Sequence, residues 1–191
     1  ALTNSIYDMD NAYKRFFKEH AGYPKFKSKH NSRQSYKTNN SHKNIAVDFE
    51  ENTIKLPKLG KIKAKVHRTF DGFIKNATVF CTPSGKYYVS ICVDSVMPEF
   101  HSASGIVGID LGLKNLCTCS DGTKFDGLDF TKLQSRLKRQ QRNLSKKTKG
   151  GSNYKKQKVR LARLHERISN VRKDSLHKLS RSLVEENQII V

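Results

Sequence analysis

Residues 105–122 read GIVGIDLGLKNLCTCSDG, and this stretch decides the fold of the second half of the chain. Apolar residues at 106–109 and at 116–120 predict two short strands, and residues 112–115 supply the turn of a β-hairpin. Asp110 lies inside the first strand, where burial of an ionised carboxylate is costly unless it is paired or binds a metal. The position of Asp110 therefore predicts a bound cation. The alternative is an aspartate whose oxygens accept hydrogen bonds from turn amides.

The elements around this hairpin follow the order of a ribonuclease H-like sheet. A third β element is predicted at 123–125, helical segments follow it, and an apolar strand begins at about residue 187. In that architecture, acids from separate strands hold two Mg²⁺ ions, which activate water and stabilise the leaving oxygen during phosphodiester cleavage. We therefore expect an α+β fold with a short recognition helix, a small antiparallel β-barrel, and a partial ribonuclease H-like α/β domain that carries a basic helical hairpin.

The positive charge is concentrated in one element. The 191 residues include 37 Lys and Arg against 17 Asp and Glu, a formal net charge of +20. Residues 131–181 hold 18 of the basic residues and only Glu166 and Asp174 as acids, a net charge of +16. Such a concentration destabilises a compact chain by self-repulsion unless a polyanion relieves it, which favours nucleic acid over an anionic membrane surface.

Composition also excludes several classes of protein. No apolar run approaches the roughly 18–20 residues of a membrane span, and the first residues do not form a signal peptide. The four cysteines are too few and too unevenly spaced for a disulfide scaffold, so we expect reduced thiols. We therefore expect a soluble intracellular protein with no membrane partner and no small-molecule substrate.

The basic element is predicted to be a helical hairpin. Leucines and other apolar residues recur at helical spacing over 130–144 and again over 161–171, and residues 149–153 break the pattern. A solvated, charge-rich helix is the alternative, but such a helix usually mixes the two signs of charge. We therefore predict phosphate contacts from the exposed basic residues Arg136, Lys138, Arg139, Arg142, Lys146, Lys147, Lys155, Lys156, Arg160, Arg163, Arg167, Arg172 and Lys173.

The first half of the chain has two patterns. Residues 2–17 predict an amphipathic helix, and the extended segment after it interleaves aromatic rings with lysines. Rings that stack on bases and cations that contact phosphate suit single-stranded or guide RNA, whereas aromatics that anchor a linker are an equally open alternative. The candidate RNA-binding residues are Tyr23, Lys25, Phe26, Lys27 and Lys29.

Residues 45–95 then change to evenly spaced short strands, which predict a small antiparallel barrel. We expect strands at 45–49, 53–56, 62–66, 74–81 and 87–93. Cys81 and Cys92 fall within hairpin strands and are expected to be core thiols. The predicted domains are a helical end with a basic linker at 1–44, the barrel at 45–104 and an incomplete nuclease domain at 105–191.

Several motifs resemble one known family. The sequence VGIDLGLKNL at 107–116 is similar to the first RuvC motif of the TnpB (OrfB) family, the transposase-like proteins of insertion sequences that are related to type V CRISPR effectors. Further stretches resemble the same family in the same order, at 21–29, 54–60, 161–168 and 172–180. The apolar run at 187–191 stops in mid-strand, so we expect a fragment of such a protein.

The resemblance implies an RNA-guided DNA endonuclease with guide RNA and target DNA as partners, acting in transposition and DNA recombination. It also implies a cytoplasmic prokaryotic protein that associates with the nucleoid when it binds DNA. Its RuvC site uses three acids and Mg²⁺, and Asp110 matches the first acid as a catalytic residue and metal ligand. The second acid is expected just after residue 191, and the third acid and a four-cysteine zinc ribbon further on, so no Zn²⁺ is expected here. Glu185 and Glu186 are expected to face solvent rather than to replace the second acid. The chain alone is therefore expected to be inactive as a nuclease, and a noncatalytic RNA- or DNA-binding remnant is the alternative.

Overall fold

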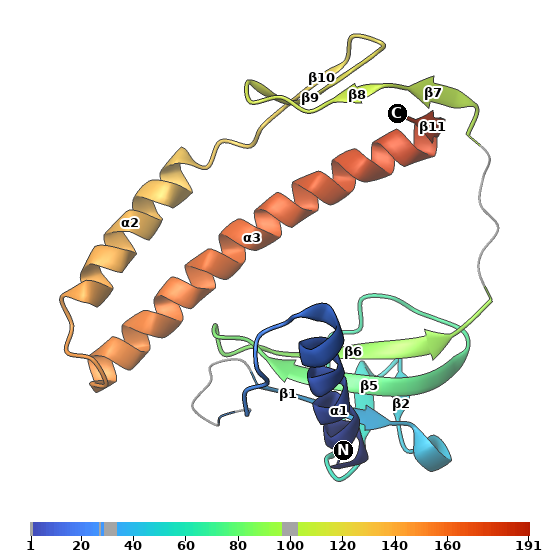
Figure 1. Ribbon diagram of the computed structural model, residues 1–191, viewed down its shortest axis with the longest axis vertical. Coiled ribbons are helices and arrows are strands. Elements are labelled where there is room, and N and C mark those ends of the chain that lie inside the picture. Colours follow the sequence, from blue (N-terminus) through green and yellow to red (C-terminus); the bar gives the residue numbers. More distant parts are fainter. Residues whose placement is uncertain (1, 27, 29–33, 97–102) are drawn as a thin grey trace. The chain divides into compact units, whose positions relative to one another are not determined.

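The computed structural model describes residues 2–26, 28, 34–96 and 103–191. The chain divides into two compact units, Ala1–Met97 and Pro98–Val191, and Figure 1 labels their α-helices and most of their strands. Within the described ranges, no helix is both long enough and apolar enough to cross a membrane. Helices and small, mostly antiparallel sheets make up both units, so the expected α+β class is confirmed.

The first unit begins with α1 (Leu2–Glu19), which confirms the helix predicted over residues 2–17. None of its residues is buried, so its apolar stripe packs little against the unit. Tyr23 contacts two rings of α1 edge to face, with centroid distances of 6.2 Å to Tyr13 and 5.5 Å to Phe16. These ring contacts hold the segment after the helix against α1.

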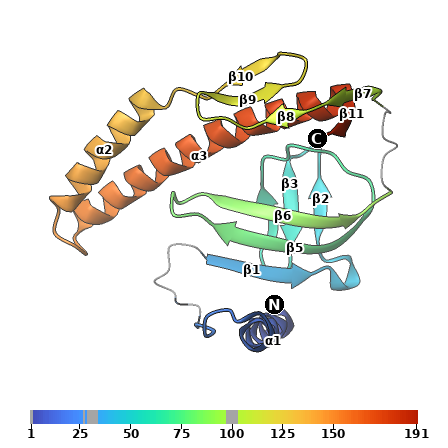
Figure 2. The same ribbon diagram turned by 45° about the horizontal axis from the view of Figure 1, so that its top comes forward.

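Two three-stranded antiparallel sheets follow, and Figure 2 shows β2 and β3 running across the direction of β5 and β6. One sheet has the order β1 (Gln34–Asn39), β5 (Phe73–Cys81), β6 (Tyr87–Asp94). Apolar side chains of both sheets form one core, whose buried members are Ile45, Ile54, Leu56 and Ala77.

The second sheet is built from β2 (Ala46–Asp48), β3 (Thr53–Leu56) and β4 (Gly60–Lys63). Each of the five strands predicted between residues 45 and 95 has a counterpart, although the strand predicted at 62–66 is observed as β4, which ends at Lys63. The predicted barrel is wrong, because no sheet of the described residues closes on itself. Strand β1, which is polar, pairs with β5 and adds a strand that the sequence did not predict. Its sequence, QSYKTN, has no alternation of apolar and polar residues, so the sequence did not predict this strand.

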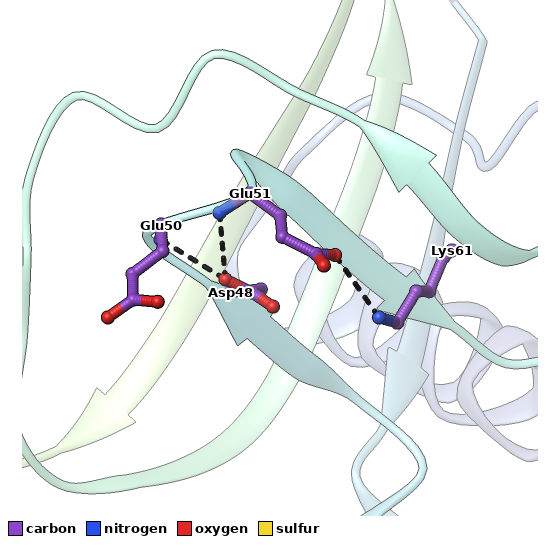
Figure 3. Close-up of polar contacts among 4 residues, drawn as sticks. All are labelled: Asp48, Glu50, Glu51 and Lys61. Atoms are coloured by element: carbon purple, nitrogen blue, oxygen red, sulfur yellow. Dashed lines mark hydrogen bonds and ion pairs between the residues drawn. The ribbon is translucent and has the colours of Figure 1, made fainter.

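A turn rich in acids joins β2 to β3, as Figure 3 shows. The Oδ1 atom of Asp48 accepts hydrogen bonds from the backbone N–H groups of Glu50 (3.1 Å) and Glu51 (2.9 Å). The Glu51 carboxylate pairs with Lys61 of β4 at 3.2 Å. These acids stabilise the turn and tie it to the neighbouring strand, which accounts for their presence in a basic protein.

The second unit contains the predicted hairpin. Strands β8 (Ile109–Asp110), β9 (Asn115–Cys119) and β10 (Lys124–Asp126) form an antiparallel sheet in that order. Val107, Cys117 and Cys119 are buried, and burial raises the pKa of the Cys119 thiol. All four cysteines are free, and Cys92 of β6 is exposed, so the prediction of a core thiol is wrong for Cys92.

Strand β7 (Gly105–Val107) pairs in parallel with β11 (Asn187–Ile190), which confirms the strand predicted near residue 187. Backbone hydrogen bonds continue this pairing past the strand ends, from Val191 to Val107 (3.0 Å) and from Ile109 to Val191 (2.8 Å). A Cβ atom on Gly105 would lie 2.6 Å from the carbonyl oxygen of Glu186, so only glycine fits where β7 passes this carbonyl group.

Two helices connect β10 to β11 and form the predicted antiparallel hairpin, which is visible at the left of Figure 1. They are α2 (Thr131–Ser145) and α3 (Ser152–Glu186), joined through the glycine pair of residues 150–151. Asp129 accepts a 2.8 Å hydrogen bond from the Thr131 backbone N–H at the start of α2. Hydrogen bonds from the Thr131 side chain and backbone lower the pKa of the Asp129 carboxyl group.

Candidate nucleic-acid interface

Four arginines surround a cavity between α2 and α3. The cavity has a volume of about 500 Å³ and is lined by Arg136, Gln140, Arg160, Arg163, Leu164 and Arg167. Three of the arginines come from α3 at steps of three and four residues, which place them on one side of that helix, and Arg136 comes from α2. We call this group the arginine cavity. Its lining contains no carboxylate.

A buried glutamine, Gln157, holds Gln140, one of the residues that line the arginine cavity. The side-chain amide of Gln157 donates hydrogen bonds to the Gln140 side-chain oxygen (2.7 Å) and to the Gln140 backbone oxygen (3.3 Å). Gln157 is only 4% exposed. These bonds lock α2 against α3 at the level of the cavity, so the positions of the surrounding arginines depend on the packing of two helices.

The electrostatics of the arginine cavity favour an anion. Among the described residues, no ion pair is found for Arg136, Arg160 or Arg167. Two ion pairs on α3 lie nearer its C-terminal end, where Asp174 contacts Lys178 at 2.8 Å and Glu185 contacts Arg181 at 2.7 Å, whereas Arg163 and Glu166 each have an interaction of their own. Like charges held together repel one another, and an anion with several oxygens relieves that repulsion through paired N–H donors.

The sequence prediction included all four arginines of this cavity but not the two glutamines. Gln157 lies four residues before Leu161 and therefore on the same side of α3 as the apolar stripe. This spacing could have predicted from the sequence that Gln157 faces inward. The glutamines matter because they position the arginines, although neither carries charge.

The other predicted phosphate contacts are spread along the hairpin and are not gathered at one site. Lys147 lies beside the turn and lines a second cavity of about 210 Å³ together with Lys149 and Tyr154. Exposed positions along the two helices and their turn hold Lys138, Arg139, Arg142, Lys146, Lys155, Lys156 and Lys173. The hairpin therefore presents an extended basic surface, and the arginine cavity is the place where four arginines line one hollow.

Arg172 makes a contact within the protein. Its guanidinium lies over the ring of Phe130, 5.4 Å from the ring centroid, which is the geometry of a cation–π interaction. Both residues line an apolar cavity of about 260 Å³ with Leu128 and Leu176. Arg172 thus packs α3 against the start of α2, and its predicted contact with phosphate stays a prediction.

In the first unit, the predicted RNA-binding segment is described in part. Tyr23 contacts the rings of α1, which favours the alternative of an aromatic anchor for this residue. Lys25 and Phe26 are exposed and make no ring contact among the described residues. Lys27 and Lys29 lie outside the described residues.

Asp110 lies at the end of β8 and is exposed. The expectation that it is buried in an apolar strand is therefore wrong, because β8 is only two residues long and its end reaches solvent. In the part of the chain that the structure describes, no group of three His, Cys, Asp or Glu side chains could hold a metal ion. A single carboxylate does not form a two-metal site, so the described residues alone do not fit Mg²⁺ as a catalytic pair. Glu185 and Glu186 are exposed, as predicted.

The fold and these sites define a class: an α+β protein that carries a strongly basic helical hairpin with an arginine-lined cavity. Residues 90–191, more than half of the chain, match the OrfB_IS605 family, described as "Probable transposase". The chain belongs to this family, and the resemblance noted from its motifs is confirmed.

Two relatives match along the whole chain. One, from Escherichia coli (strain K12), is named "Putative RNA-guided DNA endonuclease InsQ" and is 38% identical over 193 residues. The other, from Streptomyces pristinaespiralis, is named "Putative RNA-guided DNA endonuclease" and is 32% identical over 195 residues. The chain covers 46% of the first relative and 47% of the second, so it spans about half the length of each.

Proposed function

We propose that this chain is part of a transposon-encoded, RNA-guided DNA endonuclease of the TnpB type and supplies nucleic-acid contacts to it. The observation that carries the proposal is the arginine cavity, which four arginines line and whose lining contains no carboxylate. The family membership and the names of both relatives support the same activity class. Guide RNA and target DNA are the proposed partners, and DNA in the prokaryotic cytoplasm is the proposed location.

The helical hairpin binds the sugar–phosphate backbone. A guanidinium is planar and offers paired N–H donors that match two phosphate oxygens, so a cluster of arginines holds a phosphate in a defined orientation. The lysines along the two helices add attraction that does not depend on base sequence. The arginine cavity thus fixes the register of the strand, and the surrounding lysines contribute to affinity.

We further propose that β7, β8, β9, β10 and β11 belong to a ribonuclease H-like sheet. The parallel pairing of β11 with β7, next to the antiparallel β8–β9–β10 ladder, supports this assignment. In the whole protein, Asp110 would contribute one ligand to a metal site that other residues complete. Bound Mg²⁺ supplies activation of water and stabilisation of the leaving oxygen in such sites.

A second candidate function is nucleic-acid binding without catalysis. The exposed carboxylate of Asp110 favours it, because no group of three His, Cys, Asp or Glu side chains among the described residues could hold a metal ion. The two candidates agree on the role of the hairpin and differ only in the role of Asp110. A substitution of Asp110 therefore separates them.

We expect Asp110→Ala to abolish guide-dependent DNA cleavage in a chimera. In this chimera the chain replaces the matching segment of the Escherichia coli relative, so that both halves of the protein are present. Loss of a ligand removes the metal that the reaction needs, so cleavage of a matched DNA target in Mg²⁺ should fall to background. The measurement is the rate of target cleavage with a matched guide RNA.

Asp121→Ala is the matched control, since Asp121 is also an exposed aspartate of the same unit and accepts a hydrogen bond from the Thr123 backbone N–H in the turn after β9. The control chimera should cleave at the rate of the parent chimera. If Asp110→Ala cleaves as fast as the parent, Asp110 is not a metal ligand and the noncatalytic function is favoured.

A further inference from the structure

A separate cavity lies beside the turn of the helical hairpin. It has a volume of about 210 Å³ and shares no lining residue with the arginine cavity. Leu144 of α2 and Leu161 of α3 line it from the two helices, and Tyr154 lines it from the first turn of α3. We call it the turn cavity. Its lining combines one aromatic ring with two aliphatic side chains.

The ring of Tyr154 is not engaged by other groups in the described part of the chain. No hydrogen bond and no ring contact of Tyr154 is found there, and the side chain is half-buried. Aromatic rings attract other flat rings, and the hydroxyl group of a tyrosine usually finds a polar partner. This side chain is therefore available to a ligand with a planar, polar ring.

The surroundings of the turn cavity are positively charged. Lys147 and Lys149 belong to its lining, and no ion pair is found for either lysine among the described residues. Residues 130–165 contain 13 Lys and Arg and no Asp or Glu. An apolar hollow with a ring and two cations is complementary to a nucleotide, whose flat base is flanked by negatively charged phosphates.

Two polar side chains of the lining can meet the edge of a base. Gln141 is exposed, and its amide group offers both donor and acceptor atoms. The Ser145 hydroxyl donates a 2.9 Å hydrogen bond to the Arg142 backbone oxygen, which leaves the hydroxyl oxygen able to accept another. The turn cavity thus offers apolar contact, hydrogen bonds and positive charge together.

We propose that the turn cavity binds one unpaired base of an RNA strand, which contacts the ring of Tyr154 while Lys147 and Lys149 contact neighbouring phosphates. A base within a duplex cannot take this place, because its faces are already stacked. RNA presents unstacked bases in bulges and loops. This site rests on the proposed function for its RNA partner and adds contact with a base to the backbone contacts of the hairpin.

The test compares two RNA hairpins that differ only in the base of one bulged nucleotide. One carries a bulged uridine, and the other carries an abasic ribose at the same position, so the two have the same charge. We expect the unaltered chain to bind the uridine hairpin more tightly by roughly 5- to 150-fold, the range for one stacked base. The ratio of the two dissociation constants is measured on one protein preparation, so it does not depend on the fraction of chain that is folded.

Tyr154→Ala should bring this ratio close to one, because the variant lacks the ring. Phe130→Ala is the matched control, since Phe130 lines a different cavity of the same hairpin and its ring is already covered by the Arg172 guanidinium. The control should keep the ratio of the unaltered chain. If Tyr154→Ala keeps the full ratio, or if both variants lose it equally, the turn cavity is not the base site.

The measurement also distinguishes failure of this site from failure of the proposed function. An unaltered chain that binds both RNA hairpins with equal affinity would overturn the base site and leave the proposed function standing, and Tyr154 would then only pack the turn. An unaltered chain that binds neither hairpin would overturn both. A preference for the bulged base that appears in DNA hairpins of the same design, and not in RNA, would overturn the assignment to RNA.

Discussion

Replacing Arg136, Arg160 and Arg167 together by glutamine is expected to lower the affinity of the chain for single-stranded RNA by roughly 100-fold, taking about 1 kcal/mol for each charge-assisted contact. The three arginines line the same cavity and have no ion-pair partner among the described residues, so their charge is available to phosphate. The slope of log affinity against log salt concentration should decrease in magnitude by about 2, at roughly 0.7 for each lost phosphate contact. Fluorescence anisotropy of a labelled RNA measures both quantities.

A matched triple variant separates local contact from overall charge. Lys55, Lys58 and Lys63 are exposed in or beside β3 and β4, and their replacement by glutamine removes the same three charges from the first unit. If the arginine cavity binds phosphate, this control should lose much less affinity than the arginine variant. Equal losses in the two triple variants would show that only net charge matters, which would contradict a phosphate site between α2 and α3.

Leu164→Ala is expected to have the largest effect on stability in the helical hairpin. Leu164 of α3 is 7% exposed and lies in the wall of the arginine cavity. Truncation of a buried leucine costs about 2–5 kcal/mol, and the open cavity beside Leu164 allows neighbouring groups to relax, so we expect a loss of about 2–3 kcal/mol. Urea unfolding followed by circular dichroism at 222 nm reports on α2 and α3, because these helices contribute most of the helical signal.

Val184→Ala serves as the control for this substitution. Val184 is on the same helix but is mostly exposed, so its truncation leaves no cavity and should change the free energy of unfolding by about 0.5 kcal/mol or less. A comparable loss in both variants would mean that α3 is not packed through Leu164. In that case the walls of the arginine cavity would not be fixed by the interface between α2 and α3.

The regular elements of the fold could be predicted because local patterns determine them. The apolar spacing of α2 and α3, and the glycine pair between them, are typical of a helical hairpin. The sequence of the turn between β8 and β9 likewise predicts that these two strands form a hairpin. Strand β1 could not be predicted, because its pairing with β5 depends on backbone hydrogen bonds and not on its polar side chains. The absence of a closed barrel also depends on long-range pairing, which periodicity does not encode.

The candidate site was predictable in its chemistry and not in its arrangement. Composition identifies the arginines of the hairpin, but their convergence depends on how α2 packs against α3 through Gln140 and Gln157. The exposure of Asp110 was missed because the apolar residues before it suggested a longer, buried strand.

The salt dependence of RNA binding by the unaltered chain tests the central claim most directly. If the basic hairpin neutralises six to ten phosphates, the affinity should fall by roughly 10³- to 10⁵-fold between 50 and 200 mM salt. The measurement is the dissociation constant for a single RNA across that range at constant pH. A dissociation constant that stays the same across the range would contradict the account, because binding would then not depend on contacts with the phosphate backbone.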